Sequence, residues 1–138
     1  MYFKGIVLFQ QYSKNGISVK LSTKKLNDLN DETKAVLMNL LESNMKKLYE
    51  ENNKSWSDKE KMNEMFGDKN GASWYLLAEN YDDGTIVGFS HFKFELDYGD
   101  EVLYVHEIQV DSKFQRKGLG QFMMQVLEML GKYTRDSI

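Results

Sequence analysis

The sequence feature that most constrains the fold of this chain is a short turn with two glycines. It lies between a predicted strand and a predicted helix. The turn spans residues 115–120, with the sequence Gln-Arg-Lys-Gly-Leu-Gly. Residues 102–110 before it are mostly apolar, as in a strand, and residues 122–130 after it have the apolar spacing of a helix. Glycines let backbone N–H groups approach an anion, and a helix N-terminus adds a partial positive charge. With the cations Arg116 and Lys117, the turn predicts a phosphate or pyrophosphate site.

Two common phosphate-binding patterns are absent from this turn. A P-loop needs Lys and then Ser or Thr after its second glycine, and a dinucleotide fingerprint needs a third glycine where this chain has Met123. The remaining pattern, Gln115-x-x-Gly118-x-Gly120, resembles the acetyl-CoA pyrophosphate turn of the GNAT acyltransferases. The alternative is an ordinary connection between a strand and a helix.

Longer segments resemble one branch of that family, the NatD-type acetyltransferases that modify the α-amino group of core histones. The resemblance covers roughly residues 40 to 132. It implies transfer of an acetyl group from acetyl-CoA to the N-terminus of a basic, histone-like protein. The similar segments are Asn44–Glu50, Trp56–Lys61, Trp74–Ala78, Phe89–Phe94, Gly99–Tyr104, Glu107 and Arg116–Gly120.

The composition favours one folded domain over residues 1–138. Aromatic residues make up 13% of the chain, which argues against disorder. A formal net charge of −3 argues against a nucleic-acid binder and suits a basic partner. There are no cysteines and only two histidines, so thiol chemistry is excluded and no metal site is expected.

Neither a membrane span nor a secretory signal is expected. The chain has no run of about twenty apolar residues, which a spanning helix requires. The opening residues 1–9 form a short, interrupted apolar stretch with no small-residue cleavage site. We therefore expect a cytoplasmic or nuclear protein.

The resemblance implies an α/β (α+β) fold of GNAT type, and the hydrophobic pattern predicts where its elements lie. Its first part is a strand over Ile17–Leu21, a helix over Asp28–Glu50, and a second helix that begins at a Ser57 cap with Glu60 three residues on. The expected buried positions of the two helices are Leu37, Leu40, Leu41, Met45 and Leu48 in the first, and Met62, Met65 and Phe66 in the second.

The second part is an antiparallel meander of three strands, followed by the cofactor-binding helix. The strands are expected over residues 74–79, 86–96 and 101–110, with turns at 82–85 and 97–100, and the helix over about 118–132. The GNAT fold continues with another strand, a helix and a hairpin, which Thr134–Ile138 do not supply. We therefore expect missing C-terminal strands, an unpaired sheet edge and an incomplete acetyl-CoA cleft.

The expected catalytic base is Glu107, a carboxylate within an apolar strand. Burying it is unfavourable unless it is paired or functional, and its position matches the general base of the NatD branch. The alternative is a buried glutamate satisfied by nearby donors. Simple alternation places Glu107 on one face with Leu103, Val105 and Gln109, and opposite Tyr104, His106 and Ile108, unless a bulge changes the parity.

Two neighbours of Glu107 complete the predicted catalytic set. Tyr104 matches a tyrosine of the branch, and its alternative role is plain strand packing. His106 stands where the branch has another tyrosine, so it is a departure that could relay a proton or simply be a core histidine. His91 also matches the branch, and we expect a structural role for it.

The resemblance also implies two binding regions. The cofactor region comprises Ile108, Gln109 and Val110 for the pantetheine arm, and Arg116, Lys117, Gly118, Leu119, Gly120 and Gln121 for the pyrophosphate. The substrate region comprises Tyr49, Glu95, Leu96, Asp97, Tyr98, Gly99 and His106, where carboxylates would bind a basic side chain. The alternative for this acidic run is a solvated loop.

One departure weakens the implied peptide specificity. Lys54 replaces a tryptophan that lines the substrate site of the branch, and a lysine there disfavours a basic peptide. Two other functions remain open from the sequence. The first is a GNAT acyltransferase that acts on a lysine side chain or a small amine, and the second is a CoA-binding fragment without turnover.

Overall fold

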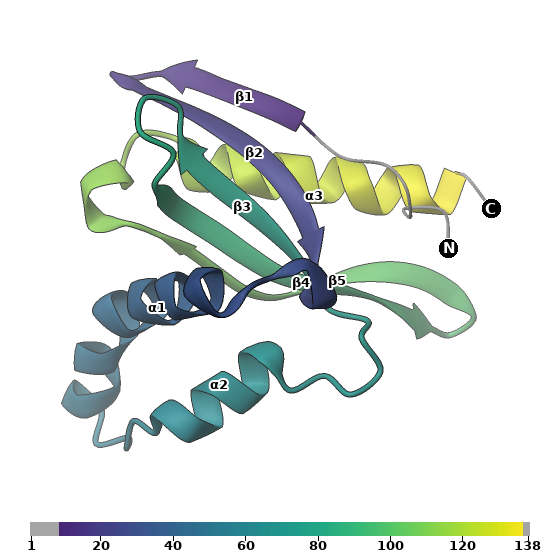
Figure 1. Cartoon of the computed structure of the whole chain (residues 1–138). Helices are drawn as coiled ribbons and strands as arrows, with labels where there is room; N and C mark the ends of the chain where they lie inside the picture. Colours follow the sequence, from purple (N-terminus) through teal and green to yellow (C-terminus); the bar gives the residue numbers. More distant parts are fainter. Residues whose placement is uncertain (1–8, 137–138) are drawn as a thin grey trace.

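The computed structural model describes residues 9–136, which form one curved antiparallel sheet with helices on both faces (Figure 1). The opening run considered above lies almost wholly in residues 1–8, outside the described residues. The sheet order follows the chain order, so each strand pairs with the next. The strands are β1 (Phe9–Lys14), β2 (Ile17–Lys25), β3 (Trp74–Asn80), β4 (Ile86–Asp97) and β5 (Asp100–Val110).

The first strand was not predicted. β1 and β2 form a hairpin whose two turn residues, Asn15 and Gly16, have φ angles of 55° and 82°. Positive φ at both positions is typical of the tightest hairpin turn, for which Asn-Gly is the favoured pair. β1 itself is mostly polar, so its hydrophobic pattern carries little signal, but the Asn-Gly pair would have indicated the hairpin.

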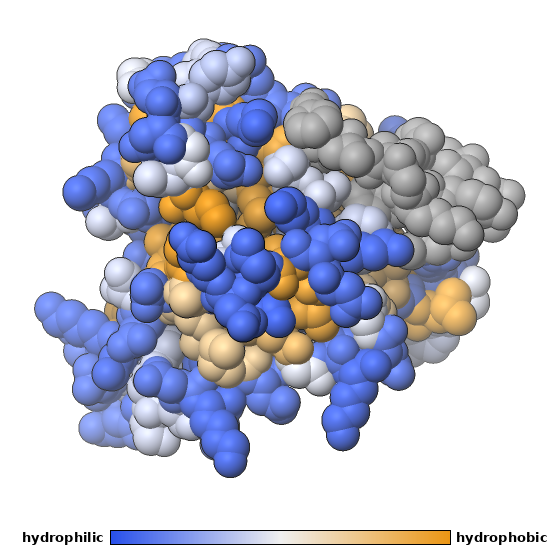
Figure 2. All heavy atoms as spheres, in the orientation of Figure 1, coloured by the Kyte–Doolittle hydropathy of each residue, from blue (hydrophilic) through white to orange (hydrophobic). Residues whose placement is uncertain are grey.

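The helices cover the two faces of the sheet. Helices α1 (Asp31–Glu51) and α2 (Asp58–Phe66) pack on one face, and α3 (Leu119–Asp136) packs on the other (Figure 1). β3 is buried on both faces: Trp74, Leu76 and Ala78 join the core under α3, and Tyr75 and Leu77 join the core under α1 and α2. Figure 2 shows the outer surface in the same orientation, covered mostly by hydrophilic side chains with hydrophobic residues visible between them.

The ends of α1 and α2 follow the expected capping chemistry. The Asn30 side chain accepts from the Thr33 N–H at 2.8 Å, and Ser57 Oγ accepts from the Glu60 N–H at 3.2 Å, as predicted for the second helix. The predicted buried faces are only partly correct, because Leu48 is 49% exposed and Met62 is 42% exposed. Periodicity identifies one face of a helix, but not how far along the helix that face is covered.

A β-bulge between β4 and β5 decides which side chains reach which face. His91 pairs with Glu107 and the next pair is Phe92 with Val105, so His106 is an extra residue in β5. Val105 packs against the core under α3, as do Ile108 and Val110 beyond the bulge. The simple alternation expected above is therefore wrong, because the extra residue reverses the parity and separates Glu107 from Val105.

The β4–β5 hairpin extends beyond the body of the sheet (Figure 1). Its turn residues Tyr98 and Gly99 have φ angles of 51° and 85°, which gives the tight turn expected at 97–100. β5 is the last strand in the sheet of the described residues, so its outer edge has no strand partner there. Among residues 9–136, no helix is long and apolar enough to cross a membrane.

Candidate active site

A pocket of about 240 Å³ lies between the sheet and the α1–α2 layer. Both residues at the bulge, His106 and Glu107, line it, although regular alternation would have placed them on opposite faces. The pocket also contains the buried His91 from β4. Its other lining residues are Leu41 from α1 and Lys61, Glu64 and Met65 from α2.

A chain of amide groups holds the Glu107 carboxylate. Gln109 Nε2 donates to Glu107 Oε2 at 2.7 Å, and Asn44 Nδ2 donates to Gln109 Oε1 at 2.9 Å. Gln109 is buried and Glu107 is half-buried. The second carboxylate oxygen, Oε1, receives no hydrogen bond from the described residues. A carboxylate oxygen without a hydrogen bond can accept a proton, which is the property that a general base requires.

His106 connects the pocket to the acidic hairpin. Its Nε2 lies 3.2 Å from Glu95 Oε2, and the two side chains are 40% and 43% exposed. On its other side, the His106 ring centroid lies 5.3 Å from that of His91. His106 therefore stands between a buried ring and an exposed carboxylate.

The structure does not bring Tyr104 to the pocket. The Tyr104 side chain is 43% exposed, and its hydroxyl donates to Asp97 Oδ2 at 3.3 Å. The negative charge of Asp97 raises the pKa of the Tyr104 phenol. Of the three predicted catalytic residues, Glu107 and His106 lie together and Tyr104 belongs to the hairpin.

Lys61 is a pocket residue that the sequence analysis did not single out. Its Nζ donates to the Tyr49 hydroxyl at 2.6 Å and to Glu64 Oε1 at 3.3 Å, and it lies 4.6 Å from the Tyr49 ring centroid and 5.6 Å from that of Trp56. Burial alone would lower the pKa of Lys61, but the bonds to Tyr49 and Glu64 outweigh it and raise the pKa. A fixed cation thus lines the pocket.

The spacing of residues along α2 could have indicated that Lys61 faces the sheet. Lys61, Glu64 and Met65 recur at intervals of three and four residues, so they lie on one face of α2. Met65 was expected to be buried, which implies that its neighbours on that face point inward too. Lys54, the residue expected to weaken the peptide specificity, is exposed and does not line this pocket.

The predicted pyrophosphate turn has the geometry of an anion site. Arg116 and Gly118 have φ angles of 61° and 84°, and α3 begins directly afterwards at Leu119. The Phe122 N–H donates to the Gly118 carbonyl at 3.0 Å. The three preceding N–H groups, of Leu119, Gly120 and Gln121, come before the first intrahelical bond and are therefore available to an anion.

The residues present fit a CoA pyrophosphate. Arg116 and Gly118 are exposed and Lys117 is half-buried, so the turn carries two cationic residues directly before the free N–H groups. Upstream, a short 3₁₀ turn over Ser112–Phe114 separates β5 from this turn. The Gln115 side chain donates to the Val110 carbonyl at 2.8 Å and so ties the turn to the end of β5.

The three residues predicted to hold the pantetheine arm are not equivalent. Gln109 pairs with Phe89, and its side chain is committed to Glu107. The Val110 carbonyl already accepts from Asn44 and Gln115. Because backbone groups alternate along an antiparallel strand, those of Ile108 face the outer edge with those of Val110. Ile108 is therefore the freest backbone partner of the three.

The predicted substrate residues lie in three different places. Glu95 and Asp97 are held by hydrogen bonds to His106 and Tyr104. Leu96 and Tyr98 project into solvent at the hairpin tip, with exposures of 78% and 101%, and Gly99 is exposed beside them. Tyr49 does not line the pocket, but its hydroxyl accepts a hydrogen bond from Lys61, which does.

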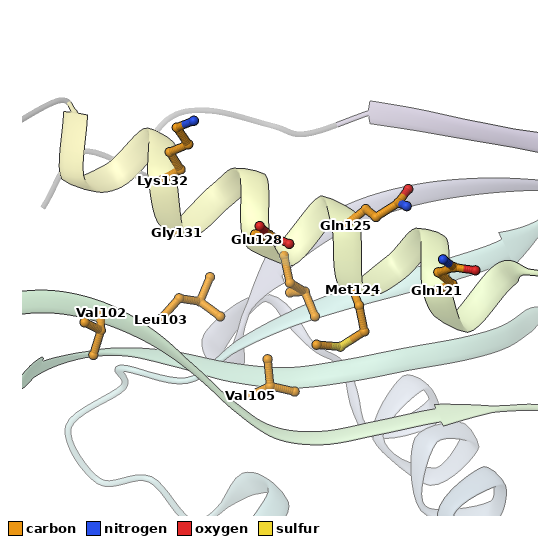
Figure 3. A pocket seen from close by; sticks show the side chains of 10 residues that line it. Val102, Leu103, Val105, Gln121, Met124, Gln125, Glu128, Gly131 and Lys132 are labelled. Carbon is orange, nitrogen blue, oxygen red and sulfur yellow. The ribbon is translucent and has the colours of Figure 1, made fainter.

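A second, larger groove of about 660 Å³ lies between the outer edge of β5 and α3 (Figure 3). Its walls include the apolar Val102, Leu103, Val105 and Met124, and among the predicted cofactor residues it contains Gln121. It lies on the opposite face of the sheet from Glu107. Among the side chains that the structure describes, residues 10–132, no cluster of His, Cys, Asp and Glu could hold a metal ion.

Comparisons with known proteins identify the family. The family model described as "Acetyltransferase (GNAT) family" matches residues 37–135, well over half of the chain. A ribosomal-protein-alanine N-acetyltransferase from Brucella melitensis biovar Abortus 2308 has a similar fold, with a TM-score of 0.60 and 22% identity over 86% of this chain and 74% of that chain.

Two further solved structures share the fold. An aminoglycoside acetyltransferase from an uncultured soil metagenomic sample, in complex with sisomicin, has a TM-score of 0.59 and 20% identity over 85% of this chain and 72% of its own. An aminoglycoside N-acetyltransferase in complex with CoA has a TM-score of 0.57 and 14% identity over 89% and 75%. These matches do not single out the NatD branch. The chain belongs to the GNAT acetyltransferase family and is an acetyltransferase that uses acetyl-CoA.

Proposed function

We propose that this acetyltransferase modifies the N-terminal α-amino group of a basic protein, with Glu107 as the general base. The observation that carries the proposal is the bulge at His106, which brings Glu107 and His106 into one pocket. An α-amino group has an unperturbed pKa near ~8, so a modest base is enough to deprotonate it. Acetyl-CoA supplies the acetyl group as a thioester.

The roles of the chain's own residues follow from their positions. Glu107 takes the proton of the amine at its free Oε1, directly or through a water molecule. Asn44 and Gln109 hold the carboxylate in place. The 115–120 turn and the N–H groups at the start of α3 bind the pyrophosphate. His106 lies beside the amine and can carry a proton toward Glu95.

The charges around the pocket support a basic acceptor in one orientation. Lys61 is a cation at the α2 wall, so a basic side chain of the acceptor is disfavoured there. Glu95 and Asp97 are exposed or half-buried carboxylates on the opposite, hairpin side. The acceptor would therefore place its amine beside Glu107 and its basic side chain toward the hairpin.

A second candidate is acetylation of a lysine side chain or a small amine. The same carboxylate would serve as base, and two of the similar solved structures are named as aminoglycoside acetyltransferases. Those names apply to those proteins, at 20% and 14% identity to this chain. These similarities are therefore compatible with a lysine or small-amine acceptor, but they do not favour it over an α-amino group.

A matched set of acceptors separates these functions. We would compare four acceptors. Two are the same basic peptide with an internal lysine, once with a free N-terminus and once with a formylated N-terminus. The others are a neutral peptide with a free N-terminus and an aminoglycoside. The release of CoA measures turnover, and mass spectrometry locates the acetyl group. We expect the free basic peptide to react fastest and the formylated peptide to be inert. Equal turnover of the formylated peptide or the aminoglycoside would overturn the α-amine assignment.

A further inference from the structure

Two side chains of the β1–β2 hairpin converge on one backbone oxygen of the cofactor turn. The Tyr12 hydroxyl donates to the Lys117 carbonyl at 2.5 Å, and Asn15 Nδ2 donates to the same oxygen at 2.8 Å. Asn15 Nδ2 also lies 3.3 Å from the Tyr12 hydroxyl. The hairpin precedes residue 37, where the match to the family model begins.

This contact fixes the direction of a peptide group within the turn. The described peptide bonds are all trans, so the Lys117 carbonyl and the Gly118 N–H of the same peptide point in opposite directions. Because Tyr12 and Asn15 hold the carbonyl toward the hairpin, the Gly118 N–H points away from the hairpin. The direction of this donor is thereby fixed before any anion arrives.

The flanking backbone needs such support. Arg116 has a φ angle of 61°, which is uncommon for a residue with a side chain and persists where the surroundings impose it. Gly118 follows at 84°, and a Cβ placed there would lie only 2.4 Å from the Tyr12 hydroxyl. The glycine at 118 is therefore required by Tyr12 as well as by the φ angle.

Tyr12 is itself firmly placed. It is buried, with 8% exposure, and its ring lies 5.0 Å from that of Phe122 in the first turns of α3. A buried phenol needs a hydrogen-bond partner, which the Lys117 carbonyl provides. The hairpin thus contacts both the turn and the helix that follows it.

We propose that Tyr12 and Asn15 are positioning residues for acetyl-CoA, and that the β1–β2 hairpin is part of the cofactor site. This inference rests on the assignment of the 115–120 turn to the pyrophosphate in the proposed function. By holding the Lys117 carbonyl, the two side chains pre-organise the turn, so less freedom is lost when the anion binds. Their effect is on the cofactor and not on the acceptor.

The first test removes one donor at a time. Tyr12→Phe keeps the ring against Phe122, and Asn15→Gly keeps a residue that tolerates positive φ. We expect Tyr12→Phe to raise the Kd for CoA and the KM for acetyl-CoA by roughly 3- to 10-fold, and Asn15→Gly by roughly 2- to 5-fold. The KM for the acceptor and kcat should stay unchanged. Ser13→Ala, an exposed hydroxyl in the same hairpin, is the control.

The second test uses Gly118→Ala with and without Tyr12→Phe. With Tyr12 present, the added Cβ meets the hydroxyl at 2.4 Å, whereas the next ring atom lies at 3.5 Å, an ordinary contact. We therefore expect Tyr12→Phe to improve, or leave unchanged, the CoA affinity of Gly118→Ala, although it weakens that of the unmodified protein. The inference would be overturned if Tyr12→Phe lowered CoA affinity equally in the unmodified protein and in Gly118→Ala. It would also be overturned if Tyr12→Phe alone left CoA affinity unchanged.

A third variant separates this inference from the cofactor assignment. Gly120→Asp places a negative charge in the first turn of α3, away from the hairpin contacts. If Gly120→Asp weakens CoA binding and Tyr12→Phe does not, the positioning role is wrong and the turn assignment stands. If Gly120→Asp leaves CoA binding unchanged, both are wrong.

Discussion

The His91 ring donates a hydrogen bond to Ser73 across 2.9 Å behind the pocket. This direction follows because Ser73 has one hydroxyl proton and donates it to Asp68 at 3.2 Å. His91 therefore carries a proton on Nε2. The ring is also stacked on Tyr75, with centroids 5.0 Å apart, so its orientation is fixed on two sides.

The neutral state of His91 predicts a pH-dependent stability. Burial, then the nearby charges of His106 and Lys93, lower the pKa of His91 from 6.5 to about 4. In the unfolded chain the pKa returns to its ordinary value, so the unfolded state binds a proton that the folded state excludes. The stabilisation is present above pH 6.5 and is lost as the pH falls toward 4. We expect a loss of about 2 kcal/mol between pH 7 and pH 5.

Urea denaturation of the protein and of His91→Gln at pH 7, 6 and 5 measures this loss. Glutamine does not titrate and keeps an N–H donor for Ser73. The free energy of unfolding of the variant should fall less steeply with decreasing pH. An identical slope for both proteins would mean that other groups cause the pH dependence.

Replacing the proposed base tests its role. Glu107→Gln keeps an oxygen that can accept from Gln109 but cannot take up a proton. We expect kcat to fall by roughly 10² to 10⁴, the usual contribution of general base catalysis, with CoA affinity unchanged. Glu64→Gln is a matched control, because Glu64 lines the same pocket. Near-normal rates for Glu107→Gln at pH 6 to 9 would assign the role to His106 or to solvent.

A negative charge introduced at the start of α3 tests whether the 115–120 turn binds the CoA pyrophosphate. A Cβ at Gly120 meets only Val110 Cγ2, at 3.9 Å, so a side chain fits there, unlike at Gly118. Gly120→Asp should stabilise the helix start but repel a phosphate, lowering CoA affinity by roughly 10- to 100-fold. Gly120→Asn has the same shape without the charge and should lose much less. Calorimetry gives both affinities, and equal losses would contradict the assignment.

If the acidic hairpin binds a basic side chain of the acceptor, removing its carboxylates should weaken the binding of a basic peptide but not of a neutral one. In the double variant Glu95→Gln/Asp97→Asn, a basic peptide should bind roughly 2- to 10-fold more weakly, because exposed ion pairs contribute up to about 1 kcal/mol each. A neutral peptide should be unaffected, and added salt should reduce the difference because it screens exposed charges. Asp82→Asn, in the β3–β4 turn, is the control. Equal effects on both peptides would identify the hairpin as a solvated loop.

Local chemistry in the sequence determined most of the elements of this fold. The Ser57 cap, the Asp-Gly turn before β4 and the two-glycine turn before α3 act over a few residues, and the structure confirms the elements they begin or end. The GNAT fold was expected from the resemblance of the 115–120 turn and its flanking segments, and the family match over residues 37–135 confirms it. The Asn15-Gly16 pair carried the same kind of signal for the first hairpin.

Only the tertiary structure decided how the site is assembled. Glu107 and His106 share a pocket because β5 carries one more residue than β4 at that point, and an extra residue exists only in the pairing of two strands. Lys61 reaches the pocket through the packing of α2. Tyr12 reaches Lys117 across 105 positions of sequence. The alternation and spacing of a single segment describe its own faces, but the neighbour that each face meets depends on how distant segments pack.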